Sequence, residues 1–110
     1  MIIIGNRTME GTAALVRREL RGAARPALEL HITGSSYAEL AELFVDNAAF
    51  SLRHGGEDYD QSEYCFAGPI TDHRDGTFSV IVGKKTPFEL EREAKEQLML
   101  ELLTERGAIV

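Results

Sequence analysis

Hydrophobic and polar residues alternate along several short stretches of this 110-residue chain, and a period of two residues predicts β-strands. The clearest case is Leu28, Leu30 and Ile32, which alternate with polar side chains. β-Branched and aromatic residues support other strands. The strands that we predict are residues 1–4, 26–33, 49–54, 63–71 and 77–84.

A period of three to four residues predicts a short helix after Ser36. Leu40, Leu43 and Phe44 recur on one face of it. Ser36 is expected to accept a hydrogen bond from the Glu39 N–H, and the Glu39 carboxylate to reach back to the Ser36 N–H.

A second helix is predicted from Thr86 as N-cap, Pro87 in the first position and Glu89 as the third helical residue. Its apolar face is Leu90, Ala94, Leu98 and Leu102, and Gly107 is expected to end it. We expect the apolar end, residues 108–110, to pack against the domain or a neighbouring subunit.

Three further stretches do not fit a regular helix or strand pattern clearly. Residues 12–20 suit a helix by composition and an edge strand by alternation, so both remain open. Residues 55–63 contain two glycines and four carboxylates, which is typical of a surface loop. Residues 72–76 end in Asp75-Gly76, which favours the turn of a hairpin.

We predict a single α+β domain over residues 1–110, an antiparallel sheet of about five or six short strands with two helices packed on one face.

Composition fits a folded protein of a reducing compartment, because 44% of the residues are hydrophobic and Cys65 is the only cysteine. The apolar run at the start stops at Gly5, so we expect neither a secretory signal nor a membrane anchor. The net charge of −6 argues against a nucleic-acid partner. Residues 1–30 carry five arginines against three acids, whereas residues 31–64 carry one arginine against seven acids.

Candidate chemistry concentrates in Asp72-His73-Arg74-Asp75. A catalytic imidazole must be held in a water-poor cleft, whereas a hairpin tip is wet, so the turn interpretation is favoured over catalysis. His31, His54 and His73 are too far apart in sequence to form a motif, and each is expected on the surface.

Residues 58–63 superficially resemble a calcium loop, because Asp58, Asp60 and Ser62 fall at alternate positions. The sixth and twelfth positions are Glu63 and Pro69, where a calcium loop has glycine and glutamate, so an acidic surface is favoured over a metal site. We predict no metal and no cofactor.

The chain runs from a short strand through GNRTMEGTA and an arginine-rich segment to RPALELHITG, then to a capped helix, and it later has ITDHRDGTFSVIVGK before the last helix. In this layout it resembles the small proteins encoded in the late, tail-region operons of tailed bacteriophages and prophages. The resemblance implies a virion or assembly component in the virion or the bacterial cytoplasm. It also favours a strand for residues 12–20, and it carries over no catalytic residue.

We therefore expect a non-enzymatic assembly or protein-interaction module that associates with itself or with phage or host proteins. Arginines of one subunit would face acids of the next in a heterologous contact that builds rings or stacks. The predicted binding residues are Arg17, Arg18, Arg21, Arg25, His54, Glu57, Asp58 and Asp60, with Glu63 beside the last three acids.

Two alternatives stay open. The first is a phage-encoded inhibitor or sponge that binds a host defence protein or a small signalling nucleotide, using Gly55-Gly56 and the arginines for capture. The second is a small hydrolase that uses His54 or His73 with aspartates.

Overall fold

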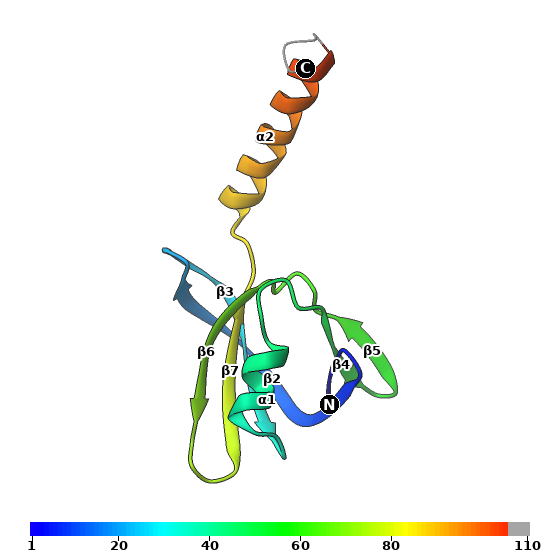
Figure 1. Ribbon diagram of the computed structural model, residues 1–110, viewed down its shortest axis with the longest axis vertical. Helices are drawn as coiled ribbons and strands as arrows, with labels where there is room; N and C mark the ends of the chain where they lie inside the picture. Colours follow the sequence, from blue (N-terminus) through cyan, green and yellow to red (C-terminus); the bar gives the residue numbers. More distant parts are fainter. Residues whose placement is uncertain (106–110) are drawn as a thin grey trace.

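A computed structural model describes residues 1–105 as a body of seven strands and one short helix, with a second helix that projects from it (Figure 1). The strands form one antiparallel sheet in the order β5-β4-β1-β2-β3-β7-β6. The general α+β class is confirmed, with seven strands in place of five or six. The strands are β1 (Ile2–Ile4), β2 (Arg7–Leu20), β3 (Ala23–Thr33), β4 (Phe50–His54), β5 (Glu57–Asp60), β6 (Phe66–Asp72) and β7 (Thr77–Gly83).

The stretch that sequence left ambiguous is strand β2, which pairs with β1 over its first residues and with β3 from Glu10 to Leu20. A two-residue turn decides this outcome. Arg21 and Gly22 have φ of 55° and 80°, and two successive positive φ angles match the right-handed twist of a tight hairpin. Long-range pairing with β3 therefore overrides the helix-favouring composition of residues 12–20.

The prediction of a loop over residues 55–63 is wrong for Glu57–Asp60, which form the edge strand β5 paired with β4. Gly55 and Gly56 make the turn, with φ of 60° and 80°. All four residues of β5 are exposed, so its acidic composition meets water as expected. The carboxylates are thus held on a straight strand and not on an irregular loop.

The core lies on one face of the sheet, under helix α1 (Tyr37–Leu43). Alternate residues of β3 and β7 supply it: Leu28, Leu30 and Ile32 stand opposite Val82, Val80 and Phe78. From α1, Leu40 is fully buried, and the ring of Phe44 meets that of Phe50 edge to face with 6.0 Å between centroids.

The N-terminal cap of α1 forms only in part. The Glu39 N–H donates to Ser36 Oγ at 3.2 Å, as expected. The Glu39 carboxylate does not take its predicted role toward the Ser36 N–H, because it forms an ion pair with Arg7 of β2. The pair fixes α1 to the sheet that it covers.

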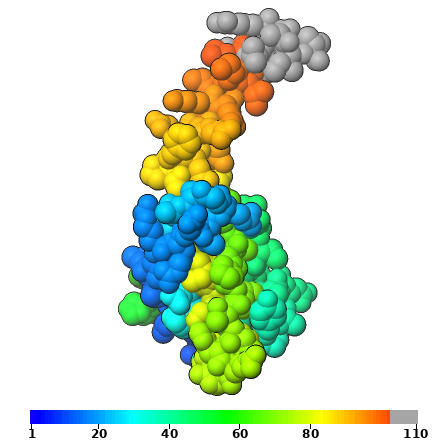
Figure 2. Space-filling model, turned by 90° about the vertical axis from the view of Figure 1, so that its left-hand side faces the viewer, coloured from blue at the N-terminus to red at the C-terminus, as the bar shows by residue number. Residues whose placement is uncertain are grey.

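Helix α2 (Pro87–Glu105) contradicts the prediction that two helices pack on one face. It leaves the end of β7 and extends away from the sheet, and the molecule measures 59 × 30 × 25 Å (Figures 1 and 2). Two features explain this. The apolar face of the sheet is already covered by α1, and the opposite face mixes the polar residues Thr12, His31, Ser79 and Thr71 with the buried Ala27 and Ile81. The predicted stop at Gly107 and the packing of residues 108–110 lie outside the described residues.

Candidate functional site

The base of α2 is held by a capping box that the sequence predicted. The Thr86 N–H donates to Glu89 Oε1 at 2.8 Å, and the Glu89 N–H donates to Thr86 Oγ1 at 3.3 Å. Each group satisfies a backbone donor at the start of the helix. The first turn of α2 is therefore capped where the helix leaves the sheet.

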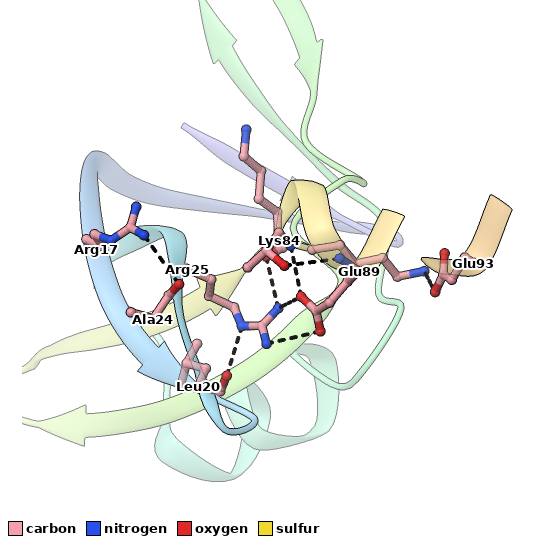
Figure 3. Close-up of polar contacts among 9 residues, drawn as sticks. Arg17, Leu20, Ala24, Arg25, Lys84, Glu89 and Glu93 are labelled. Carbon is pink, nitrogen blue, oxygen red and sulfur yellow. Dashed lines mark hydrogen bonds and ion pairs between the residues drawn. The ribbon is translucent and has the colours of Figure 1, made fainter. Parts of the chain in front are cut away.

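Arg25 joins this turn to the sheet, as Figure 3 shows. Its side chain is fully buried, and its Nη1 and Nη2 donate to the two carboxylate oxygens of Glu89 at 2.5 and 3.2 Å. Nε donates to the Leu20 carbonyl at 2.8 Å and Nη1 to the Lys84 carbonyl at 3.3 Å, while the guanidinium lies 4.6 Å from the centre of the Phe66 ring. A buried cation is stable when it is paired and hydrogen-bonded in this way.

The same contact changes the acidity of its partner. Hydrogen bonds from the Arg25 guanidinium and from the Thr86 N–H lower the pKa of Glu89 from 4.5 to about 2. Arg25 is therefore an anchor for α2, and the prediction that it is a surface contact for a partner is wrong. Arg25 lies on the register of β3 that alternates with the apolar residues. Its burial is explained by Phe66 and α2, which are distant in the sequence and lie over it.

The other predicted arginines lie at the surface of the β2 and β3 hairpin and make contacts within the chain. Arg21 donates to both carboxylate oxygens of Asp46 at 2.6 and 2.8 Å, which lowers the pKa of Asp46. Arg18 Nη2 lies 3.5 Å from Glu29 Oε2, and Arg17 Nη2 donates to the Ala24 carbonyl at 3.5 Å.

The predicted acidic residues lie at the far edge of the sheet, on β5 and its flanks. Asp58 accepts from Arg53 of β4 at 2.7 and 3.2 Å, and this pairing lowers the pKa of Asp58. Glu57 accepts from the Tyr59 hydroxyl at 3.1 Å, Asp60 accepts from the Ser62 hydroxyl at 2.7 Å, and His54 is exposed at the end of β4. The acids and the arginines do not meet within one chain, so their contact across subunits stays a prediction.

The expected hairpin tip between β6 and β7 forms at residues 73–76, and Asp72 is the last residue of β6. Asp72 Oδ1 accepts from the Arg74 N–H at 2.8 Å, and Asp75 Oδ1 accepts from the N–H and hydroxyl of Thr77 at 3.0 and 2.5 Å. The bonds from Thr77 lower the pKa of Asp75. Both carboxylates thus stabilise the turn itself.

Sequence reasoning missed a cluster on the polar face of the sheet, where two histidines converge on Ser79. His73 Nε2 lies 2.6 Å and His31 Nδ1 3.3 Å from Ser79 Oγ, and His31 Nε2 lies 3.8 Å from Glu29 Oε1. Strand pairing brings them together, because β7 lies between β3 and β6. No local spacing in the sequence could have revealed it.

The cluster has the side-chain types of acyl-transfer chemistry but not the surrounding donors. Ser79 is in the middle of β7, whose backbone N–H groups point along the sheet toward β3 and β6 and not toward the polar face. Ser79 itself is buried, but half of the His31 side chain is exposed, so water reaches the cluster on the His31 side. Among residues 1–105, no group of three His, Cys, Asp or Glu residues is placed to hold a metal ion.

Two apolar features remain. A hollow of about 400 Å³ lies at the base of α2, lined by Pro26, Glu63, Lys84, Lys85, Pro87 and Leu90. The second feature is α2 itself, which carries six of the eleven large, exposed hydrophobic residues among the part of the chain that the structure describes. They are Phe88, Leu90, Leu98, Met99, Leu100 and Leu102, with exposed fractions of 43–71%.

Comparison with protein-family models, with curated proteins and with solved structures finds no significant match to this chain. None of the helices in the described part of the chain combines the length and the hydropathy that crossing a membrane requires. Any function must therefore be inferred from the geometry of the chain itself.

Proposed function

We propose that the protein is a small, non-enzymatic phage or prophage component that acts in virion assembly or protein interaction, and that α2 is its contact arm. The observation that carries the proposal is the exposure of large apolar residues on α2, a helix that projects from the body (Figure 2). An apolar patch that a monomer leaves in water is typical of a protein-binding surface. The buried Arg25 and Glu89 pair supports the same role, because it fixes the direction of the arm.

The alternative is a nucleotide sponge, for which a second hollow is the candidate binding site. Arg18, Thr71 and Ser79 line a space of about 280 Å³ on the polar face of the sheet and offer donors to a phosphate. Glu19 and Glu29 line the same space and repel an anion. Assembly is therefore favoured, and we expect a panel of nucleotides to leave the melting temperature unchanged.

The proposal is tested by allelic exchange in the genome that encodes the protein. The arm variant is Leu98→Gln/Met99→Gln, which removes apolar surface but keeps good helix formers. The control is Leu15→Gln on β2, where a leucine is 80% exposed but belongs to the sheet and not to α2. We expect the arm variant to lower the yield of infectious particles at least tenfold, and the control to leave it unchanged.

Two results would contradict the proposal. One is a normal yield from the arm variant at normal protein levels. The other is a nucleotide that raises the melting temperature of the wild type and loses this effect in Arg18→Gln, because that outcome supports the sponge.

A further inference from the structure

Building on the proposed function, we infer that the distal half of α2 from one copy of the chain docks into the hollow at the base of α2 on a second copy. The tip is Leu98, Met99 and Leu102, with exposed fractions of 57%, 61% and 43%. The hollow is the space lined by Pro26, Pro87 and Leu90, with Lys84, Lys85 and Glu63 as its charged residues. Each surface is apolar, and each is exposed to water among the residues that the structure describes.

The tip differs from the rest of the arm. Residues 89–97 of α2 are mainly charged, whereas residues 98–102 contain one charged residue, Glu101, among four large apolar ones. A solvated helix keeps its charged face outward along its length, and an end that is apolar on most sides is typical of a buried segment. The tip therefore requires a cover that the body of the same chain does not provide.

The hollow is suited to that end of the helix by size and lining. Its volume of about 400 Å³ falls within the range of roughly 300–1,000 Å³ that binding pockets commonly have. Pro26, Pro87 and Leu90 offer carbon surface, and the hydrocarbon stems of the lysines can add to it. Apolar side chains of a docked helix would displace water from these surfaces.

Charge favours a second copy over an unrelated occupant. Helix α2 carries six glutamates against one arginine and one lysine, and the hollow is edged by two lysines, Lys84 and Lys85, against one acid, Glu63. Lys85 Nζ already lies 2.6 Å from Glu93 Oε1, and Lys84 Nζ lies 5.6 Å from the centre of the Tyr64 ring. Glu101, close to the tip, can approach these ammonium groups when the tip is docked.

The contact must be intermolecular and heterologous. Met99 lies nine residues beyond Leu90 on one straight helix, about 13 Å at 1.5 Å per residue, so the tip cannot reach the hollow at its own base. When one tip is docked, the hollow of the first copy and the tip of the second remain free. Repetition of such a contact gives a ring if the rotation closes and a filament if it does not.

The test is complementation between two variants of the whole chain, measured by light scattering after size exclusion. The tip variant is Leu98→Gln/Met99→Gln, and the hollow variant is Lys84→Glu/Leu90→Glu. We expect the wild type to assemble, and each variant alone to associate at least tenfold more weakly. An equimolar mixture should form a heterodimer of twice the 12.2 kDa chain mass and stop there, because only one functional tip and one functional hollow can meet.

Controls keep the result interpretable. Leu15→Gln should assemble as the wild type does, and circular dichroism should give each variant the helix content of the wild type. If the hollow variant has a lower melting temperature, Lys84→Glu alone takes its place in the mixture.

The inference is overturned by a wild type that stays monomeric at every concentration tested, by a mixture that stays monomeric, or by a hollow variant that still assembles alone. The last result would indicate pairing between tips. A monomeric wild type together with a loss of particles in the arm variant would overturn this inference but leave the proposed function standing, since the arm would then bind another virion or host protein.

Discussion

The body and the arm of this protein use the same kind of residue in opposite ways. Leu30 in the centre of β3 is fully buried, whereas 57% of the Leu98 side chain on α2 is exposed. In the body, strand pairing and α1 remove apolar surface from water, and this burial stabilises the fold. In the arm, similar surface remains in water and contributes little to the stability of the single chain. Stability thus comes from the body, whereas the surface for which we propose a contact role lies on the arm.

The two regions meet at one charged joint. Arg25 belongs to the sheet, Glu89 belongs to the first turn of α2, and their pair is supported by the carbonyls of Leu20 and Lys84 (Figure 3). An ion pair has a preferred geometry, whereas apolar contact alone does not. The joint can therefore set the direction of an arm that has few other contacts with the body.

The largest expected effect contrasts a buried leucine with an exposed one. Leu30→Ala should lower the free energy of unfolding by about 2–5 kcal/mol, because it leaves a cavity in the core. Leu98→Ala is the matched control, and a surface change of this kind should stay within about 0.5 kcal/mol. Urea titration followed by circular dichroism measures both. Equal losses would mean that the arm contributes to the core, and the distinction between the two regions would fail.

A smaller effect is expected at the joint. Arg25→Met keeps most of the apolar stem but removes the donors to Glu89, Leu20 and Lys84, and it should cost about 2 kcal/mol of stability. Arg21→Met is the control, because its pair with Asp46 is exposed and should matter less. Limited proteolysis should in addition cut near Lys84 and Lys85 faster in Arg25→Met. Equal stability of the two variants would refute the anchor role of Arg25.

The smallest expected effect is a pH dependence. The pKa of Glu89 is about 2 in the fold against an ordinary 4.5, so the folded state binds this proton more weakly than the unfolded state. The stabilisation is therefore complete above about pH 4.5 and is lost as the pH falls toward 2. The melting temperature of the wild type should exceed that of Glu89→Gln at pH 7, and the gap should shrink between pH 4.5 and 2. A gap that is constant with pH would mean that the carboxylate charge does not hold the joint.

Local patterns in the sequence were sufficient to predict much of the body and the existence of α2. Alternation marked β3 and β7, and Thr86 with Glu89 marked the helix start, because strands and caps depend on residues close in the chain. The direction of α2 was predicted wrongly. It depends on whether the sheet still offers an uncovered apolar face, which only the assembled fold determines.

The site residues show the same limit. Arg25 occupies a polar position in the alternation of β3, so its burial could not be expected without knowing that Phe66 and Glu89 lie over it. His31 and His73 meet at Ser79 only through the order of β3, β7 and β6. The turn at Asp72–Gly76 was predictable, since its hydrogen bonds join neighbours in sequence.

The two outer strands of the sheet bear on how copies of such a protein can gather without aggregating. β5 places Glu57, Asp58 and Asp60 within four exposed residues, and β6 carries Pro69 within a register shift between Ala67 and Ile70. Clustered like charges, proline and bulges all discourage the addition of a foreign strand to a sheet. These features disfavour edge-to-edge strand pairing between crowded copies, which would lead to fibrils. Association through side-chain surfaces, which is reversible, remains possible.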